Sequence, residues 1–214
     1  MRHIAVIDYG SGNLHSVLHA VKAASSTLSE SCHISLATTA KEIAAADAII
    51  LPGVGHFADC RANLAQVEDL EQQLADKVLT KATPFLGICV GMQLLATTGH
   101  EGTKVAGLDW IAGDVTRLQP DDGQLKIPHM GWNDVTIHHS HPVLRHMSAS
   151  PVMYFVHSYH FEAVETDKVI ASTHYGQEVT AIVARDTMIG TQFHPEKSQK
   201  EGLACLAGFL EWRP

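Results

Sequence analysis

The sequence lacks an excess of basic residues and lacks any long apolar run. Its 15 Lys and Arg are outnumbered by 23 Asp and Glu, which gives a formal net charge of −8. A negatively charged chain is poorly suited to nucleic acid or to an anionic membrane surface, so neither is an expected partner. No apolar stretch approaches the roughly 20 residues of a membrane-spanning helix.

Cysteine is also sparse. The four cysteines (Cys32, Cys60, Cys89 and Cys205) are widely spaced and include no C-x-x-C pair, which indicates a reducing compartment rather than a disulfide framework. The opening residues 1–8 are typical of a strand that ends in a carboxylate and not of a signal peptide. We therefore expect a cytoplasmic protein.

Two patterns that resemble ligand sites are incomplete. The histidines of segment 138–141 have no supporting set of Cys or carboxylate ligands, so no metal and no cofactor are expected. Gly10 and Gly12 form a G-x-G without a third glycine, which favours a tight turn between strand and helix over a dinucleotide site. Either Asn13 or Ser11 can cap the helix that follows.

The length of 214 residues and the 45% hydrophobic content predict one domain, residues 1–214, with a full core. Strands are expected at residues 3–7, 33–37, 47–51 and 84–89, and helical segments at 14–21, 39–45, 57–64 and 67–80. This alternation predicts an α/β, flavodoxin-like fold, with a mostly parallel central sheet flanked by helices.

After residue 105 the pattern changes to short alternating segments, which predict an additional antiparallel β region. These strands are expected at 114–118, 132–137, 153–159, 168–175, 179–185 and 188–193, with a rigid loop at 128–133. A helix over 196–212 closes the chain.

The segment 84–93 carries the first chemical signal. Gly87-x-Cys89-x-Gly91 is the thiol form of the nucleophile elbow, in which small residues flank a nucleophile at a tight turn from strand to helix. The helix that follows is expected from Val90 to about Thr97, with its first N–H groups directed at the sulfur. The alternative is that Cys89 is a buried core cysteine.

A second signal lies at the end of the strand 47–51. The loop Pro52-Gly53-Val54-Gly55 can turn its backbone N–H groups outward and supply half of an oxyanion hole, or it is only a flexible connection. In a parallel sheet this loop and the Cys89 elbow both lie at the carboxyl ends of strands, where open α/β sheets place their sites.

The third signal is His194-Pro195-Glu196. Residues two apart in an extended segment face the same side, so Glu196 can hold the His194 imidazole and support its positive form. A Cys89–His194–Glu196 set follows the general logic of an activated nucleophile. The alternative is a polar strand end that caps the last helix.

Taken together, these three motifs resemble the class I glutamine amidotransferase family over essentially the whole chain. More narrowly, the sequence is similar to the family of glutaminase subunits of imidazole glycerol phosphate synthases. The segments that carry this narrower similarity are 7–14, 128–133, 154–159 and 192–198. One departure is Val90, where leucine is usual, but only its backbone N–H is expected to act.

The resemblance implies roles for particular residues. Cys89, His194 and Glu196 would hydrolyse L-glutamine, while Val90 and Gly53, Val54 and Gly55 would supply the oxyanion hole. The residues that would bind glutamine are Gln93, His157, Ser158 and Tyr159.

The resemblance also implies a second chain, because 214 residues leave no room for a domain that accepts ammonia. This partner would be a cyclase of (β/α)₈-barrel type, which forms imidazole glycerol phosphate and an aminoimidazole-carboxamide ribotide in histidine biosynthesis. Candidate contacts are Lys197, Asn13, Met130 and Trp132, although Lys197 is equally compatible with a solvated charge at a helix start.

Three other functions remain open on the sequence. The chain can be the glutaminase of a different synthase, such as one that makes a pyridoxal precursor. It can be a free-standing cysteine hydrolase of γ-glutamyl compounds. It can also be a non-catalytic regulatory subunit that retains the fold.

Overall fold

The computed structural model describes residues 1–10, 12–121 and 123–214. The helices are α1 (Leu14–Ser25), α2 (Ala40–Ala44), α3 (Phe57–Gln66), α4 (Leu70–Ala75), α5 (Val90–Gln93) and α6 (Gln199–Glu211). A π-helical segment, η1 (Asp76–Thr80), extends α4, and a short 3₁₀ turn, η4 (Pro195–Lys197), precedes α6. Within the described residues, no helix combines the length and apolar character that crossing a membrane requires.

The strands form three sheets. They are β1 (Arg2–Ile7), β2 (Cys32–Ala37), β3 (Ala48–Gly53), β4 (Phe85–Cys89), β5 (Thr98–Gly99), β6 (Val105–Ala106), β7 (Gly113–Arg117), β8 (His129–Asp134), β9 (Thr136–Ile137), β10 (Val152–His157), β11 (Tyr159–Ala163), β12 (Val169–His174), β13 (Glu178–Arg185) and β14 (Met188–Thr191).

The central sheet has the order β2-β1-β3-β4-β14-β13-β12-β9. Its first five strands are parallel neighbours, and with β14 in fifth place they reproduce the flavodoxin-like order 2-1-3-4-5. The remaining pairings are antiparallel. The predicted α/β class with a flanked central sheet and an additional antiparallel region is confirmed.

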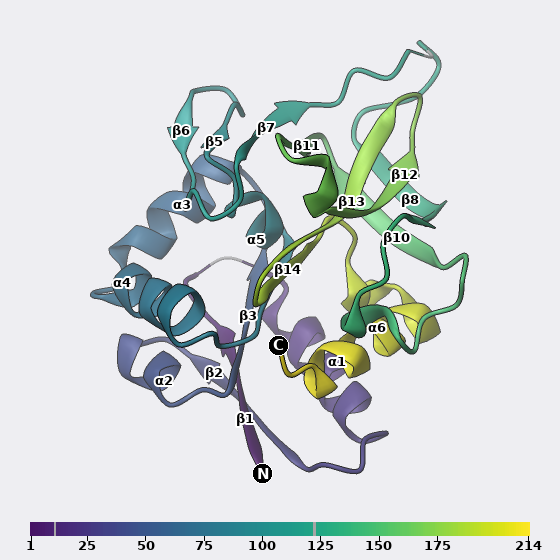
Figure 1. Ribbon diagram of the computed structural model, residues 1–214. Coiled ribbons are helices and arrows are strands. Elements are labelled where there is room, and N and C mark those ends of the chain that lie inside the picture. The colour runs from purple at the N-terminus through teal and green to yellow at the C-terminus, as the bar shows by residue number, and fades with distance from the viewer. Residues whose placement is uncertain (11, 122) are drawn as a thin grey trace.

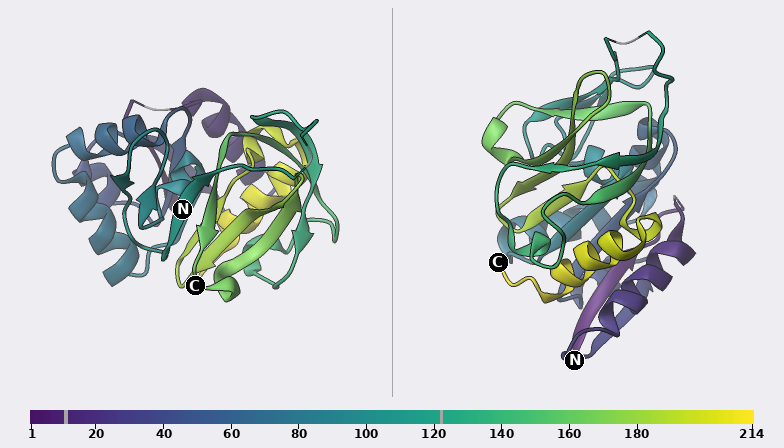
Figure 2. Two further views of the ribbon diagram at one scale, coloured as in Figure 1. Left: turned by 90° about the horizontal axis from the view of Figure 1, so that it is seen from above. Right: turned by 90° about the vertical axis from the view of Figure 1, so that its right-hand side faces the viewer.

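Helices cover both faces of the parallel half of the sheet (Figures 1 and 2). α1 and α6 contact each other on one face, and α2, α3 and α4 gather on the other. Strands β3 and β4 are therefore buried along their whole length, which explains their nearly continuous apolar sequence. Thr39 forms the capping box of α2 with Glu42.

Three expected elements differ in the structure. The helix after Cys89 ends at Gln93 rather than near Thr97, because Thr97 N–H donates to the Gly113 carbonyl and the chain enters β5. The expected loop at 128–133 is mostly strand β8, which pairs with β10. The last helix begins at Gln199, since 195–197 form the separate turn η4.

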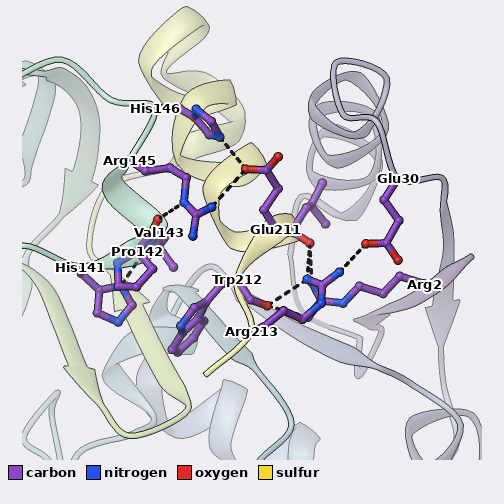
Figure 3. Close-up of polar contacts among 11 residues, drawn as sticks. Arg2, Glu30, His141, Pro142, Val143, Arg145, His146, Glu211, Trp212 and Arg213 are labelled. Atoms are coloured by element: carbon purple, nitrogen blue, oxygen red, sulfur yellow. Dashed lines mark hydrogen bonds and ion pairs between the residues drawn. The ribbon is translucent and has the colours of Figure 1, made fainter.

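The two ends of the chain are joined by polar contacts (Figure 3). The buried Arg2 guanidinium donates to the carbonyl oxygens of Leu210 and Trp212, which end α6 without intrahelical partners. On the exposed side, Arg213 pairs with Glu30. These bonds attach the end of α6 to the start of β1, at the end of the sheet opposite the carboxyl ends of the parallel strands.

Candidate active site

Cys89 occupies a strained turn at the end of β4. Its φ of 54° and ψ of −111° are unusual for a residue with a side chain. The flanking glycines are required, because a Cβ on Gly87 would lie 2.5 Å from the Gly91 carbonyl oxygen, and one on Gly91 would lie 1.9 Å from the Leu51 oxygen. The predicted elbow is therefore present. Cys89 is only 4% exposed, yet it lines a cavity rather than packing solely in the core.

His194 and Glu196 form a buried pair. The Nδ1 atom of His194 lies 2.8 Å from Oε1 of Glu196, and both side chains are 1% exposed. Burial opposes a charge on the ring, but the Cys89 sulfur and the Glu196 carboxylate outweigh it and raise the pKa of His194 to about 10. His194 Nε2 is buried without a hydrogen-bond partner among the described residues, which leaves it available to a reacting group.

These groups meet in one cavity of about 410 Å³. The predicted site residues that line it are Asn13, Val54, Gly55, Cys89, Val90, Gln93, His157, Ser158, Tyr159, His194 and Lys197. Glu196 lies behind His194, and Gly53, Met130 and Trp132 are not part of the lining. Residues from both halves of the chain thus converge on the sulfur.

The segment expected to supply the second oxyanion donor is closely fitted to the elbow. Gly53 is the register partner of Cys89 in the parallel pair of β3 and β4. A Cβ on Gly53 would lie 2.7 Å from the Gly91 nitrogen, so the backbones approach as only glycine allows. The Tyr9 hydroxyl donates to the Pro52 carbonyl oxygen at 2.9 Å and fixes the start of the turn.

The amide of Gln93 is held by the protein itself. Its Nε2 atom donates to the Tyr159 carbonyl oxygen at 2.9 Å and to Gln192 Oε1 at 3.0 Å. The Nε2 atom of Gln192 in turn lies 3.7 Å from the Sγ atom of Cys89. Sequence reasoning gave Gln192 no role, although its position two residues before His194 places it on the same side of an extended segment.

Glu101 is a second residue that sequence reasoning missed. It lines the cavity, and its Oε2 atom accepts a hydrogen bond from Phe57 N–H at 2.8 Å, at the first turn of α3. No motif surrounds it, and only the folding of the β5–β6 segment over α3 brings it to the site. It is the one carboxylate among the described residues that line the cavity.

Of the expected partner contacts, Asn13 and Lys197 line the cavity, whereas Met130 and Trp132 lie on β8 outside its lining. Met130 and Trp132 are 61% and 49% exposed on β8. Trp132 meets the Tyr154 ring edge to face at 5.8 Å between centroids, and Lys197 Nζ lies 5.9 Å from the centre of the same ring. Asn13 occupies the N-cap position of α1 without a side-chain cap bond, while Ser11, the alternative cap, lies outside the described residues.

The histidine segment 138–141 is engaged elsewhere. His138 Nε2 lies 2.7 Å from Ser172 Oγ, and His141 Nδ1 accepts from Val143 N–H. In the part of the chain that the structure describes, no three His, Cys, Asp or Glu side chains are grouped so as to hold a metal ion.

The fold resembles solved structures of glutamine amidotransferases. A putative GMP synthase chain from Thermoplasma acidophilum superposes with a TM-score of 0.69 at 20% identity, covering 98% of this chain and 92% of the other. A glutamine amidotransferase from Thermotoga maritima gives 0.64 at 16% identity, with coverages of 98% and 96%. At these identities the likeness is one of fold.

The sequence comparisons are more specific. Residues 5–211 match the family "Glutamine amidotransferase class-I". The imidazole glycerol phosphate synthase subunit HisH of Brucella suis is 51% identical over 214 residues, and that of Bradyrhizobium diazoefficiens is 50% identical, each with 99% of both chains covered. The chain therefore belongs to the class I glutamine amidotransferases and, within them, to the family of imidazole glycerol phosphate synthase subunit HisH.

Proposed function

We propose that the chain hydrolyses L-glutamine to glutamate and ammonia with a Cys89–His194–Glu196 triad, as the glutaminase subunit of an imidazole glycerol phosphate synthase. The observation that carries this proposal is the convergence of Cys89 with the buried His194–Glu196 pair on one cavity. The HisH relatives support the identity of the synthase.

The first half-reaction begins with the Cys89 thiolate, which attacks the side-chain amide carbon of glutamine. The Val90 N–H and an N–H of segment 53–55 hold the oxyanion of the tetrahedral intermediate. Removal of one such donor typically costs about 10²–10³ in rate. His194, kept positive by the Cys89 sulfur and Glu196, gives its proton to the departing nitrogen as the C–N bond breaks.

The second half-reaction releases glutamate. His194, now neutral, removes a proton from water, which attacks the glutamyl thioester. Collapse of the second tetrahedral intermediate breaks the C–S bond and restores the thiolate and the imidazolium. Glu196 orients the ring through both steps by its bond to Nδ1.

Ammonia needs a protected route, because in water it becomes ammonium, which is not nucleophilic. A cyclase subunit of (β/α)₈-barrel type would dock over the mouth of the cavity, around Lys197, Asn13, Met130 and Trp132. It would use the ammonia to form imidazole glycerol phosphate and an aminoimidazole-carboxamide ribotide.

The test is glutamine hydrolysis by the purified chain, alone and with a cyclase subunit that carries its nucleotide ligand. We expect low activity alone, a large rise in the complex, and no turnover by Cys89→Ala in an intact fold. High activity that the partner leaves unchanged would instead indicate a free-standing γ-glutamyl hydrolase. Equal turnover by wild type and Cys89→Ala would indicate a regulatory subunit.

A further inference from the structure

Two buried histidines lie side by side at the wall of the cavity. His129 on β8 and His157 on β10 are directly opposed in the antiparallel pair and are 2% and 6% exposed. Nδ1 of His129 lies 3.0 Å from Nε2 of His157. Of the two, only His157 lines the cavity, and His129 contacts His157 from outside the cavity lining.

The surroundings of His157 determine which nitrogen carries its proton. Its Nδ1 atom lies 2.9 Å from the Tyr159 carbonyl oxygen, which can only accept. His157 Nδ1 is therefore the donor, and in a neutral ring Nε2 must accept from His129 Nδ1–H. Burial keeps both rings neutral, because it lowers the pKa of His129 to about 4 and that of His157 to about 3.

The surroundings of His129 require the same arrangement independently. Asn133 Oδ1 accepts from Asp134 N–H at 2.9 Å, and Asn133 Nδ2 donates to the His174 carbonyl oxygen at 2.9 Å, so the orientation of this amide is fixed. The same Nδ2 lies 3.2 Å from His129 Nε2, which must therefore accept. Both ends of the chain of bonds thus place the proton of His129 on Nδ1.

The ring of His129 is also held in place sterically. It stacks on Phe155 at 4.8 Å and on Tyr175 at 4.1 Å between centroids, with interplanar angles of 19° and 23°. A ring held between two nearly parallel neighbours keeps its plane, so its Nδ1–H bond stays directed at His157.

The chain of bonds ends on a residue expected to bind glutamine. The Tyr159 carbonyl oxygen that accepts from His157 also accepts from Gln93 Nε2 at 2.9 Å. A change in the tautomer or rotamer of His157 would leave this carbonyl with one donor instead of two. Tyr159 and Gln93 both line the cavity, so its shape depends on His157.

We propose that His129 is a positioning residue for glutamine binding, which acts by donating Nδ1–H to His157 and so fixes the Tyr159 carbonyl and Gln93. The proposal rests on the proposed glutaminase function and on the expected role of the segment 157–159. It assigns His129 no contact with the substrate and no part in the bond-breaking steps.

Two substitutions separate the donor from the ring. His129→Phe keeps an aromatic ring between Phe155 and Tyr175 but removes the donor. His129→Asn can place an amide N–H where Nδ1–H was. In the complex with the cyclase subunit, we expect His129→Phe to raise KM for glutamine about ten-fold with little change in kcat, and His129→Asn to restore much of the loss.

A matched control changes a histidine that takes no part in these bonds. His139→Phe, the same change at an exposed histidine outside the cavity, should leave KM unaltered.

Glutamine affinity is measured directly by calorimetry with L-glutamine in a Cys89→Ala background, and the triad by the rate at which iodoacetamide alkylates Cys89. Weaker glutamine binding by His129→Phe with an unchanged alkylation rate supports the proposal. Unchanged glutamine binding by His129→Phe overturns it. So does glutamine binding by His129→Asn that is as weak as that of His129→Phe. Parallel losses of glutamine binding, alkylation rate and folding would also overturn it. Absence of turnover by the wild-type complex would instead contradict the proposed function.

Discussion

At the scale of single residues, Glu196 sets the pH up to which His194 stays protonated. Replacing it by Gln keeps the shape but removes the negative charge, so the pKa of His194 should fall from about 10. In the proposed mechanism the imidazolium supplies the proton to the leaving nitrogen, so the alkaline limb of kcat/KM should move to lower pH in Glu196→Gln. The maximal rate should fall by about 10²–10⁴. A pH–rate profile of both proteins measures this, and a lower rate with an unmoved limb would contradict the electrostatic role.

The buried pair His129 and His157 should make the fold sensitive to acid. Their pKa values are depressed by burial to about 4 and about 3, whereas in the unfolded chain both lie near 6.5. Below pH 6.5 the unfolded state therefore binds more protons, and the free energy of unfolding falls as the pH drops towards about 4. Denaturant unfolding at about pH 7.5, 6 and 5 should show that the free energy of unfolding falls less steeply with decreasing pH in His129→Asn than in wild type. Equal declines would mean that His129 takes up a proton without unfolding.

The residues found from sequence are those whose chemistry lies in local spacing. Cys89 is marked by two glycines and His194 by a carboxylate two positions later. Gln192 and His129 lie inside the segments that carry the family resemblance but received no role, because their partners are 103 and 28 positions away. Such contacts depend on sheet order and register, which no local pattern specifies.

At the scale of elements, the elbow depends on the absence of a side chain at Gly91. A Cβ there would lie 1.9 Å from the Leu51 carbonyl oxygen, and backbone atoms of β3 cannot move without disturbing the sheet. Gly91→Ala should therefore lower the free energy of unfolding by about 3 kcal/mol or more. Gly123→Ala is the matched control, because nothing lies within 4 Å of its added methyl group. Denaturant unfolding compares the two, and equal stabilities would refute the steric account.

Helices and strands were predictable where a local sequence pattern is enough to specify them. The buried strands β1, β3 and β4 follow from apolar runs, and α2 follows from the Thr39 cap. The short α5 was not predictable, because Thr97 leaves the helix for a hydrogen bond to the distant Gly113. The first half of strand β8 was predicted as a loop, since its glycine and preceding proline are typical of turns and only its pairing with β10 makes it a strand.

At the scale of the whole molecule, the topology itself brings the site together. The adjacent parallel strands β3, β4 and β14 all end at one edge of the central sheet, which aligns the Gly53 segment, Cys89 and the chain that leads to His194. The antiparallel region then contributes 157–159 and the exposed face of β8. The residues of the proposed triad therefore follow the general rule for open α/β sheets, whereas much of the cavity wall comes from the additional region.

The same geometry predicts where a partner gains most of its affinity. Trp132 is 49% exposed, packs edge to face on Tyr154 and lies on the strand that carries His129. Half-exposed aromatic residues on a firm support are the usual energetic centres of an interface. Trp132→Ala should therefore weaken binding to the cyclase by about ten-fold or more.

Calorimetric titration of the cyclase partner measures this, with Val164→Ala as the control, because Val164 is 74% exposed but lies outside the cavity lining and the expected contacts. If both variants bind like the wild type, β8 does not face the partner. The ammonia route would then have to leave the cavity on another side, past Val54 or Glu101 rather than past Lys197. A loss confined to Trp132→Ala instead places the partner beside Lys197 and Asn13 of the cavity lining, as the proposed direct transfer of ammonia from this chain to the partner requires.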